Sequence, residues 1–161
     1  MRRNRLVGLV GLAVAVCSTL SGCTVPVAGV TGIAVTDDGK PLGVMLVCHD
    51  RIDGATLYSD EEEADYLGRW IRGKPAKGYT LWRLDTGGRG WTTDMPVAAL
   101  EPRRTYSLYG WTRDNSWSTE HVDFTLEQLA RLEPGQVRYW KDDGYATVTA
   151  DVFRSEACRG L

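Results

Sequence analysis

Short strand-like segments separated by turn-forming residues are the feature that most restricts how this chain can fold. Turn compositions rich in Asp, Gly, Asn and Pro lie between them, as at residues 37–41 and 112–116. Segments of this kind indicate strands of an antiparallel all-β protein. The predicted strands are 29–35, 44–48, 80–84, 105–111, 118–125 and 146–152.

The segment 146–152 has the clearest period-two pattern, with Ala146, Val148, Ala150 and Val152 on one predicted strand face. Helix signals are brief. Residues 125–128 form a capping-box pattern, and the dipeptide at 134–135 ends that short helix.

Three further segments have sequence patterns that predict local structure. Residues 59–62 could cap a second short turn. The acidic run 60–65 lacks the ligand order of an EF-hand loop, so it is interpreted as a solvated face rather than a calcium site. The dipeptide Asp53-Gly54 predicts another turn.

The expected fold is therefore an all-β, two-sheet β-sandwich with one or two short helical turns. Two local resemblances point to the same class. Leu100–Tyr106 and Leu132–Tyr139 resemble the Leu-x-Pro corner before a strand tyrosine in immunoglobulin-like and fibronectin-type domains. Residues 30–41 resemble the opening hairpin of transthyretin-like and carboxypeptidase-regulatory-like sandwiches.

The N-terminus has the pattern of an export signal. Three arginines precede the apolar run Leu6–Val16, which would cover roughly 16 Å as a helix and is too short to span a bilayer comfortably. The sequence Leu20-Ser21-Gly22-Cys23 then resembles the lipobox of bacterial lipoproteins. The alternative is an ordinary secreted protein in which Cys23 has no role.

The lipobox resemblance implies that residues 1–22 are a signal peptide and that Cys23 carries the lipid. Residues 23–29 would be a short tether, and residues 30–161 a single domain on the outer face of the cell membrane. As a whole the chain is similar to small actinobacterial lipoproteins, a resemblance that implies location and no activity. The sequence leaves open whether export is general or twin-arginine.

Two cysteines remain after Cys17 leaves with the leader and Cys23 is lipidated. An oxidising compartment favours a disulfide between Cys48 and Cys158, with two free buried thiols as the alternative. The chain has no CxxC motif or Cys/His cluster, so neither a zinc site nor any other cofactor is predicted.

Catalytic motifs are absent from the sequence. It contains no Gly-x-Ser-x-Gly elbow, and its two histidines, His49 and His121, lie outside recognisable motifs. His121 is interpreted as the solvent-facing neighbour of Asp123. We therefore expect a noncatalytic binding domain; the alternative is an envelope hydrolase with a carboxylate or His121 site.

Six tryptophans are more than a small core usually needs. Aromatic rings beside polar groups are typical of sugar- and peptide-binding surfaces, although cross-strand packing is the alternative for each ring. We expect Trp111 to be structural and Trp117 to be available to a ligand. The candidate ligand-binding residues are Trp111, Arg113, Asp114, Asn115 and Trp117.

The net charge of the chain limits which classes of partner it is expected to bind. After removal of residues 1–22 the chain keeps 16 basic and 21 acidic residues, a net charge of −5. Such a domain is not drawn to nucleic acid. The expected partners are the membrane, contacted through acyl chains, and a cell-envelope glycan or protein.

Overall fold

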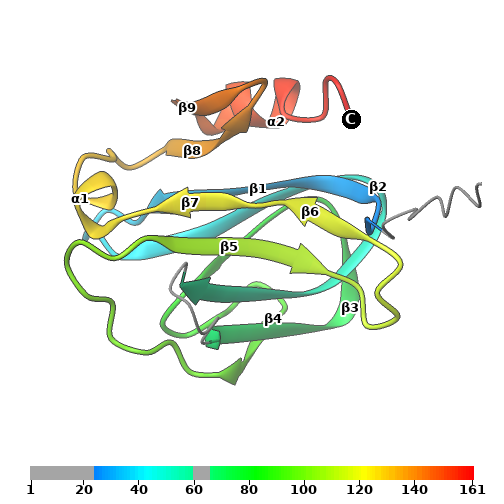
Figure 1. Cartoon of the computed structure of the whole chain (residues 1–161), viewed down its shortest axis with the longest axis horizontal. Helices are drawn as coiled ribbons and strands as arrows, with labels where there is room; N and C mark the ends of the chain where they lie inside the picture. The colour runs from blue at the N-terminus through cyan, green and yellow to red at the C-terminus, as the bar shows by residue number, and fades with distance from the viewer. Residues whose placement is uncertain (1–23, 60–65) are drawn as a thin grey trace, which may run out of the picture.

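The computed structural model describes residues 24–59 and 66–161 and confirms the all-β class with two short helices (Figure 1). The predicted signal peptide, the predicted lipobox with Cys23 and the acidic run 60–65 lie outside the described residues. The elements are β1 (Val27–Val35), β2 (Pro41–Ser59), β3 (Tyr66–Arg83), β4 (Trp91–Met95), β5 (Tyr106–Trp111), β6 (Ser118–Glu120), β7 (Val122–Phe124), α1 (Leu126–Leu129), β8 (Gln136–Lys141), β9 (Gly144–Thr149) and α2 (Ala150–Glu156).

The long strand β2 connects the layers of the molecule. Its first part, residues 41–47, pairs with β1, and its last part, residues 54–59, pairs with β5. The register shifts between Val47 and Gly54, where Asp50 has a φ of 51°. The predicted turn at Asp53-Gly54 is therefore wrong, because both residues continue the bent strand.

The described strands form one hydrogen-bonded sheet in the order β4-β3-β2-β5-β6-β1-β8-β9, with β7 beside β5. β6 pairs with β5 and also runs parallel to β1, so the pairing of β1, β2, β5 and β6 closes on itself. The two sheets expected of a sandwich are thus joined through β2 rather than separate.

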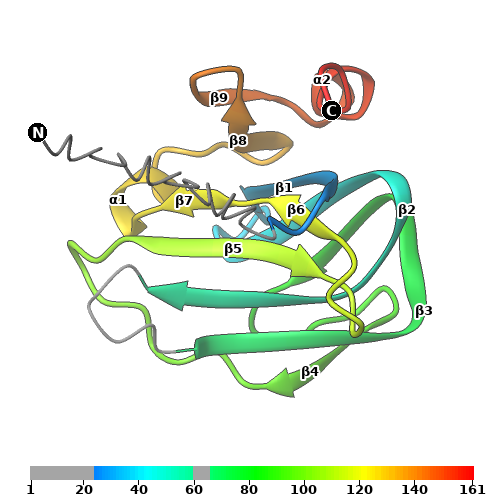
Figure 2. The ribbon, with the colours of Figure 1, turned by 45° about the vertical axis from the view of Figure 1, so that its right-hand side comes forward.

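β1 is buried on both faces. Ile33 and Val35 belong to the main core, which also contains Trp70 and Leu108, whereas Val30 belongs to a second core. The second core lies against β8, β9 and α2, which Figure 2 shows as a separate layer beyond β1. Gly32 allows this close approach, since an added Cβ would lie 2.6 Å from Val137 Cγ1.

The C-terminal strand is shorter than its alternation predicts. β9 ends at Thr149, which caps α2 by accepting a hydrogen bond from the backbone N–H of Val152. Helix formation directs Phe153 into the second core, where it packs edge-on against Tyr139 at 5.0 Å between ring centroids. The predicted strand 146–152 is therefore wrong beyond Thr149.

The other local predictions have mixed outcomes. The hairpin between β1 and β2 forms as expected, and the capping box of α1 is confirmed by reciprocal bonds between Thr125 and Gln128. The predicted strand 118–125 is instead divided at His121 into β6 and β7, which pair with different ends of β5.

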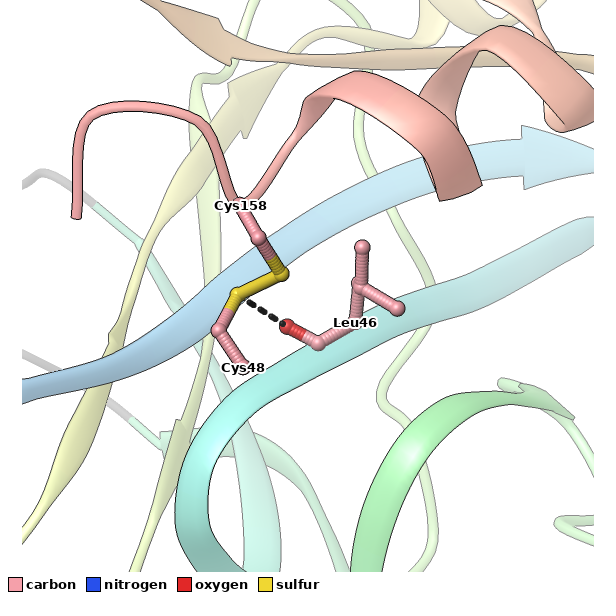
Figure 3. Close-up of a disulfide and its surroundings, with 3 residues drawn as sticks. All are labelled: Leu46, Cys48 and Cys158. Atoms are coloured by element: carbon pink, nitrogen blue, oxygen red, sulfur yellow. Dashed lines mark hydrogen bonds between the residues drawn. A yellow bond between two sulfur atoms is a disulfide. The ribbon is translucent and has the colours of Figure 1, made fainter.

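The structure joins Cys48 to Cys158 by a disulfide with Cα atoms 5.7 Å apart, as predicted (Figure 3). The bond connects the chain after α2 to β2 just before its register shift. β8 forms only two residue pairs with β1, through Tyr139 and Arg138, so the disulfide supplements a short sheet contact.

We expect Cys158→Ser to lower the free energy of unfolding by about 4 kcal/mol, because the disulfide restricts a long loop in the unfolded chain. Urea denaturation of the purified variant measures this loss. Reduced wild-type protein and the Cys48→Ser/Cys158→Ser double variant serve as controls and should match the single variant. Equal stability of the oxidised wild type and Cys158→Ser would contradict the prediction.

Two buried tyrosines differ in what their hydroxyls contact. The Tyr106 hydroxyl accepts a hydrogen bond from the backbone N–H of Glu101 at 2.5 Å, as in a tyrosine corner. Tyr139 follows the similar Leu-x-Pro segment, but its buried hydroxyl has no hydrogen-bond partner among the described residues. Only the first of the two segments therefore makes this corner bond.

We expect Tyr106→Phe to destabilise the domain by about 1 kcal/mol, the usual net contribution of such a bond. Tyr139→Phe is the matched control. It should change stability by less than about 0.5 kcal/mol or increase it, because it removes an unpaired buried hydroxyl. Paired chemical denaturation curves compare them, and equal losses would refute the difference.

Candidate functional site

A groove of about 790 Å³ lies on the outer face of the layer formed by β3, the last part of β2 and β5. Figure 2 shows these three strands side by side. We call this feature the aromatic groove. The side chains that determine its chemistry are Tyr58, Tyr66, Arg69, Tyr109, Trp111, Arg113 and His121.

Strand register explains why aromatic side chains gather there. Thr56 is paired with Tyr109, and Gly54 is paired with Trp111, so these positions share the outer face. Their neighbours Leu57 and Leu108 face the main core. The period of two along β2 and β5 therefore separates the groove from the core.

Gly54 provides the space that Trp111 occupies. A Cβ at Gly54 would lie 2.3 Å from Trp111 Cζ2, so the indole rests against the backbone of β2. The indole Nε1–H donates to Thr56 Oγ1 at 2.8 Å. The Arg69 guanidinium lies 4.7 Å from the ring centroid, a cation–π distance. Trp111 is thus held in place while remaining half-buried.

Three tyrosines continue the groove beyond Trp111. Tyr58 and Tyr109 meet edge to face, with ring centroids 5.8 Å apart, and Tyr66 is 64% exposed. Burial raises the pKa of the Tyr109 hydroxyl, and the neighbouring hydroxyls of Tyr66 and Tyr58 raise it further. Tyr109 therefore stays a neutral hydrogen-bonding group at physiological pH.

The charged side chains in the described lining of the groove are guanidinium groups. Among the described residues the lining includes Arg69, Arg113 and His121 but no carboxylate. Asp94 lies 3.4 Å from Arg69 Nε, and Asp123 lies 3.7 Å from His121 Nε2; neither acid lines the groove. A chain with an excess of acidic residues therefore has a groove whose lining charge is positive.

The turn between β5 and β6 is built by side chains that sequence analysis assigned to a ligand. Asp114 accepts hydrogen bonds from Ser116 Oγ at 2.6 Å and from Arg51 Nη2 at 2.9 Å. The bond from Ser116, with others from the turn and the charge of Arg51, holds the pKa of Asp114 well below its usual range. Asp114 thus stabilises the turn and does not line the groove.

Arg113 and Asn115, two of the predicted ligand-binding residues, line the groove. The backbone N–H of Arg113 donates to the buried carboxylate of Asp53 at 3.0 Å, which fixes the start of the turn on β2. Arg113 Nη2 donates to the backbone oxygen of Arg72 at 3.1 Å. Asn115 has a φ of 55°, a left-handed conformation that asparagine tolerates.

The structure places the two tryptophans of the turn in different surroundings. Trp111 lines the groove, whereas Trp117 is packed against the main core. Trp117 directly precedes β6 and does not line the groove. Trp70, Trp82 and Trp91 are buried in the core, where Trp82 stacks on Trp91 at 4.3 Å.

Sequence reasoning missed Tyr58, Tyr66, Arg69 and Tyr109. The spacing of Tyr109 and Trp111 in one strand was a usable signal for a shared aromatic face. The strand that contains Tyr58 was not predicted, because 49–59 contains charged residues and glycine that resemble a loop. Tyr66 and Arg69 lie in the part of β3 before the predicted strand 80–84.

The described part of the chain gives little support for a metal site or for a membrane-spanning helix. Residues 24–59 and 66–161 contain no group of three or more His, Cys, Asp or Glu arranged to hold a metal ion. His49 is exposed after Cys48. None of the helices in the same ranges is long and apolar enough to cross a membrane.

Comparison of the chain with protein-family models, curated proteins and solved structures finds no significant match.

We expect Gly54→Ala to displace the Trp111 indole, since the added methyl group would overlap it. The variant should shift the Trp111 Nε1–H resonance in NMR spectra and lose about 1–3 kcal/mol of stability through overpacking. Gly73→Ala is the control, because a Cβ at Gly73 meets nothing within 4 Å. An unchanged Trp111 resonance in Gly54→Ala would contradict the proposed contact.

Proposed function

We propose that this chain is a lipid-anchored lipoprotein on the outer face of the cell membrane whose β domain binds a cell-envelope ligand without catalysis. The observation that carries the binding proposal is the aromatic groove. Its exposed and half-buried rings offer apolar surface, and Arg69 and Arg113 offer directional hydrogen-bond donors. The lipobox resemblance of residues 20–23 supports the anchor.

Rings of this kind suit a glycan better than a flat protein surface. An indole or phenol can cover the C–H face of a sugar, while nearby hydroxyl, amide and guanidinium groups orient its hydroxyls. Trp111 is positioned by Gly54 and Thr56 before any ligand arrives. Such preorganisation lowers the entropic cost of binding.

The second candidate is an envelope hydrolase, and the place of His121 in the groove favours it. A hydrolase needs a nucleophile or water activated by a base, together with a group that orients the base. Asp123 could orient His121, but no described hydroxyl or thiol hydrogen-bonds to the imidazole. The described lining also contains neither of the two carboxylates needed for glycoside hydrolysis. Binding is therefore the better-supported function.

We expect Cys23→Ala to abolish lipid attachment, because the thioether bond requires the cysteine sulfur. Metabolic labelling with a tagged fatty acid, followed by immunoprecipitation, measures incorporation. Cys48→Ser is a control for loss of an unrelated cysteine and should retain the label. Label retained on Cys23→Ala, or absent from the wild type, would disprove the anchor.

A further inference from the structure

We propose that the aromatic groove binds the headgroup of a membrane lipid in which a polyhydroxylated ring carries a phosphate. This inference rests on the proposed function and names the ligand class of the same groove. Three observations support this inference. They are the charge of the groove lining, the arrangement of its aromatic rings, and the closeness of the groove to the residues that follow Cys23.

The charge of the lining selects an anion. Arg69 and Arg113 are the guanidinium groups of the groove, and its described lining contains no carboxylate. A guanidinium presents a planar set of N–H donors that matches phosphate oxygens. Because the chain as a whole has more acidic than basic residues, this local sign is not a consequence of composition.

The aromatic rings of the groove favour a ligand that offers C–H surface as well as a phosphate. The Trp111 indole rests against the Gly54 backbone, and the Arg69 guanidinium lies 4.7 Å from its ring centroid, so the cation stands directly beside aromatic surface. Tyr58 and Tyr109 extend that surface along β2 and β5. A ring with C–H faces can pack on the aromatic side chains while its phosphate reaches the arginines.

The position of the groove points to the bilayer as the source of this ligand. Thr24 and Val25 are part of its lining. Thr24 directly follows Cys23, and consecutive Cα atoms are about 3.8 Å apart. If Cys23 carries the lipid, one edge of the groove lies next to the anchor, where headgroups are concentrated and soluble ligands are not.

The test uses the protein with its own lipid anchor in phosphatidylcholine nanodiscs. Tryptophan is replaced biosynthetically by 5-fluorotryptophan, and the Trp111 signal is assigned by its loss in Trp111→Phe. The discs are doped with phosphatidylinositol, phosphatidylglycerol or digalactosyldiacylglycerol. These lipids supply ring and phosphate together, phosphate without a ring, and rings without phosphate.

We expect the Trp111 fluorine resonance to shift with phosphatidylinositol at about tenfold lower lipid content than with either other lipid. Arg69→Gln/Arg113→Gln should weaken that response about tenfold. Arg83→Gln/Arg131→Gln, which makes the same charge change outside the groove, should leave it within about twofold.

Several outcomes would overturn the inference. An equal response to phosphatidylglycerol would show that the ring is not recognised. An equal response to digalactosyldiacylglycerol, unaffected by Arg69→Gln/Arg113→Gln, would show a neutral-sugar groove. A shift with soluble inositol 1-phosphate but none with phosphatidylinositol discs would place the ligand off the membrane. No shift with any probe would remove the headgroup assignment.

The proposed function is tested by measurements other than the Trp111 fluorine signal. Absence of fatty-acid label on the wild type disproves the anchor, whatever the groove binds. Release of free headgroup from the discs, followed by phosphorus NMR and abolished in His121→Ala, would identify a hydrolase. All variants share the acidic run 60–65, so its charge does not affect their comparison.

Discussion

The change of partner along β2 is the constraint on which the rest of this structure depends. Before Val47 the strand pairs with β1, and from Gly54 it pairs with β5, while β3 accompanies it on the other side. Backbone N–H and C=O groups in a buried strand need hydrogen-bond partners, and β2 finds them in β1 before its bend and in β5 after it. The same strand therefore belongs to both layers, and the main core lies between the two layers.

Burial of β1 on both faces explains the third layer. Val30 and Ala34 face away from the main core and would expose apolar surface if β8, β9 and α2 were absent. These C-terminal elements cover them with Phe153 and Tyr139, and the disulfide from Cys48 ties the layer to β2. The disulfide, second core and bend are therefore parts of one arrangement.

The groove uses the side of the molecule that this arrangement leaves open. Carboxylates near it have positioning roles: Asp53 holds the turn at Arg113, and Asp114 holds the turn at Ser116. Asp94 and Asp123 contact Arg69 and His121 without lining the groove. The acids thus contact cationic side chains from outside the groove, whose described lining consists of guanidinium groups, aromatic rings and other side chains without a carboxylate.

Local chemistry in the sequence was sufficient to predict the all-β class, the first hairpin, the α1 capping box and the Cys48–Cys158 disulfide. Each depends on residue preferences over a few positions or on the compartment's redox state. The alternation in 146–152 was misleading, because a threonine cap and helical packing of Phe153 outweigh strand preference after Thr149.

The groove required tertiary structure. Arg113 and Asn115 could be selected from a polar turn, but Tyr58, Arg69 and Tyr109 come from three strands whose register sets their common face. The face on which Trp111 lies depends on its register with Gly54 in β2. A sequence determines which side chains alternate along a strand. The packing of the closed sheet decides which of the two faces is covered, since only long-range pairing places one face against the core.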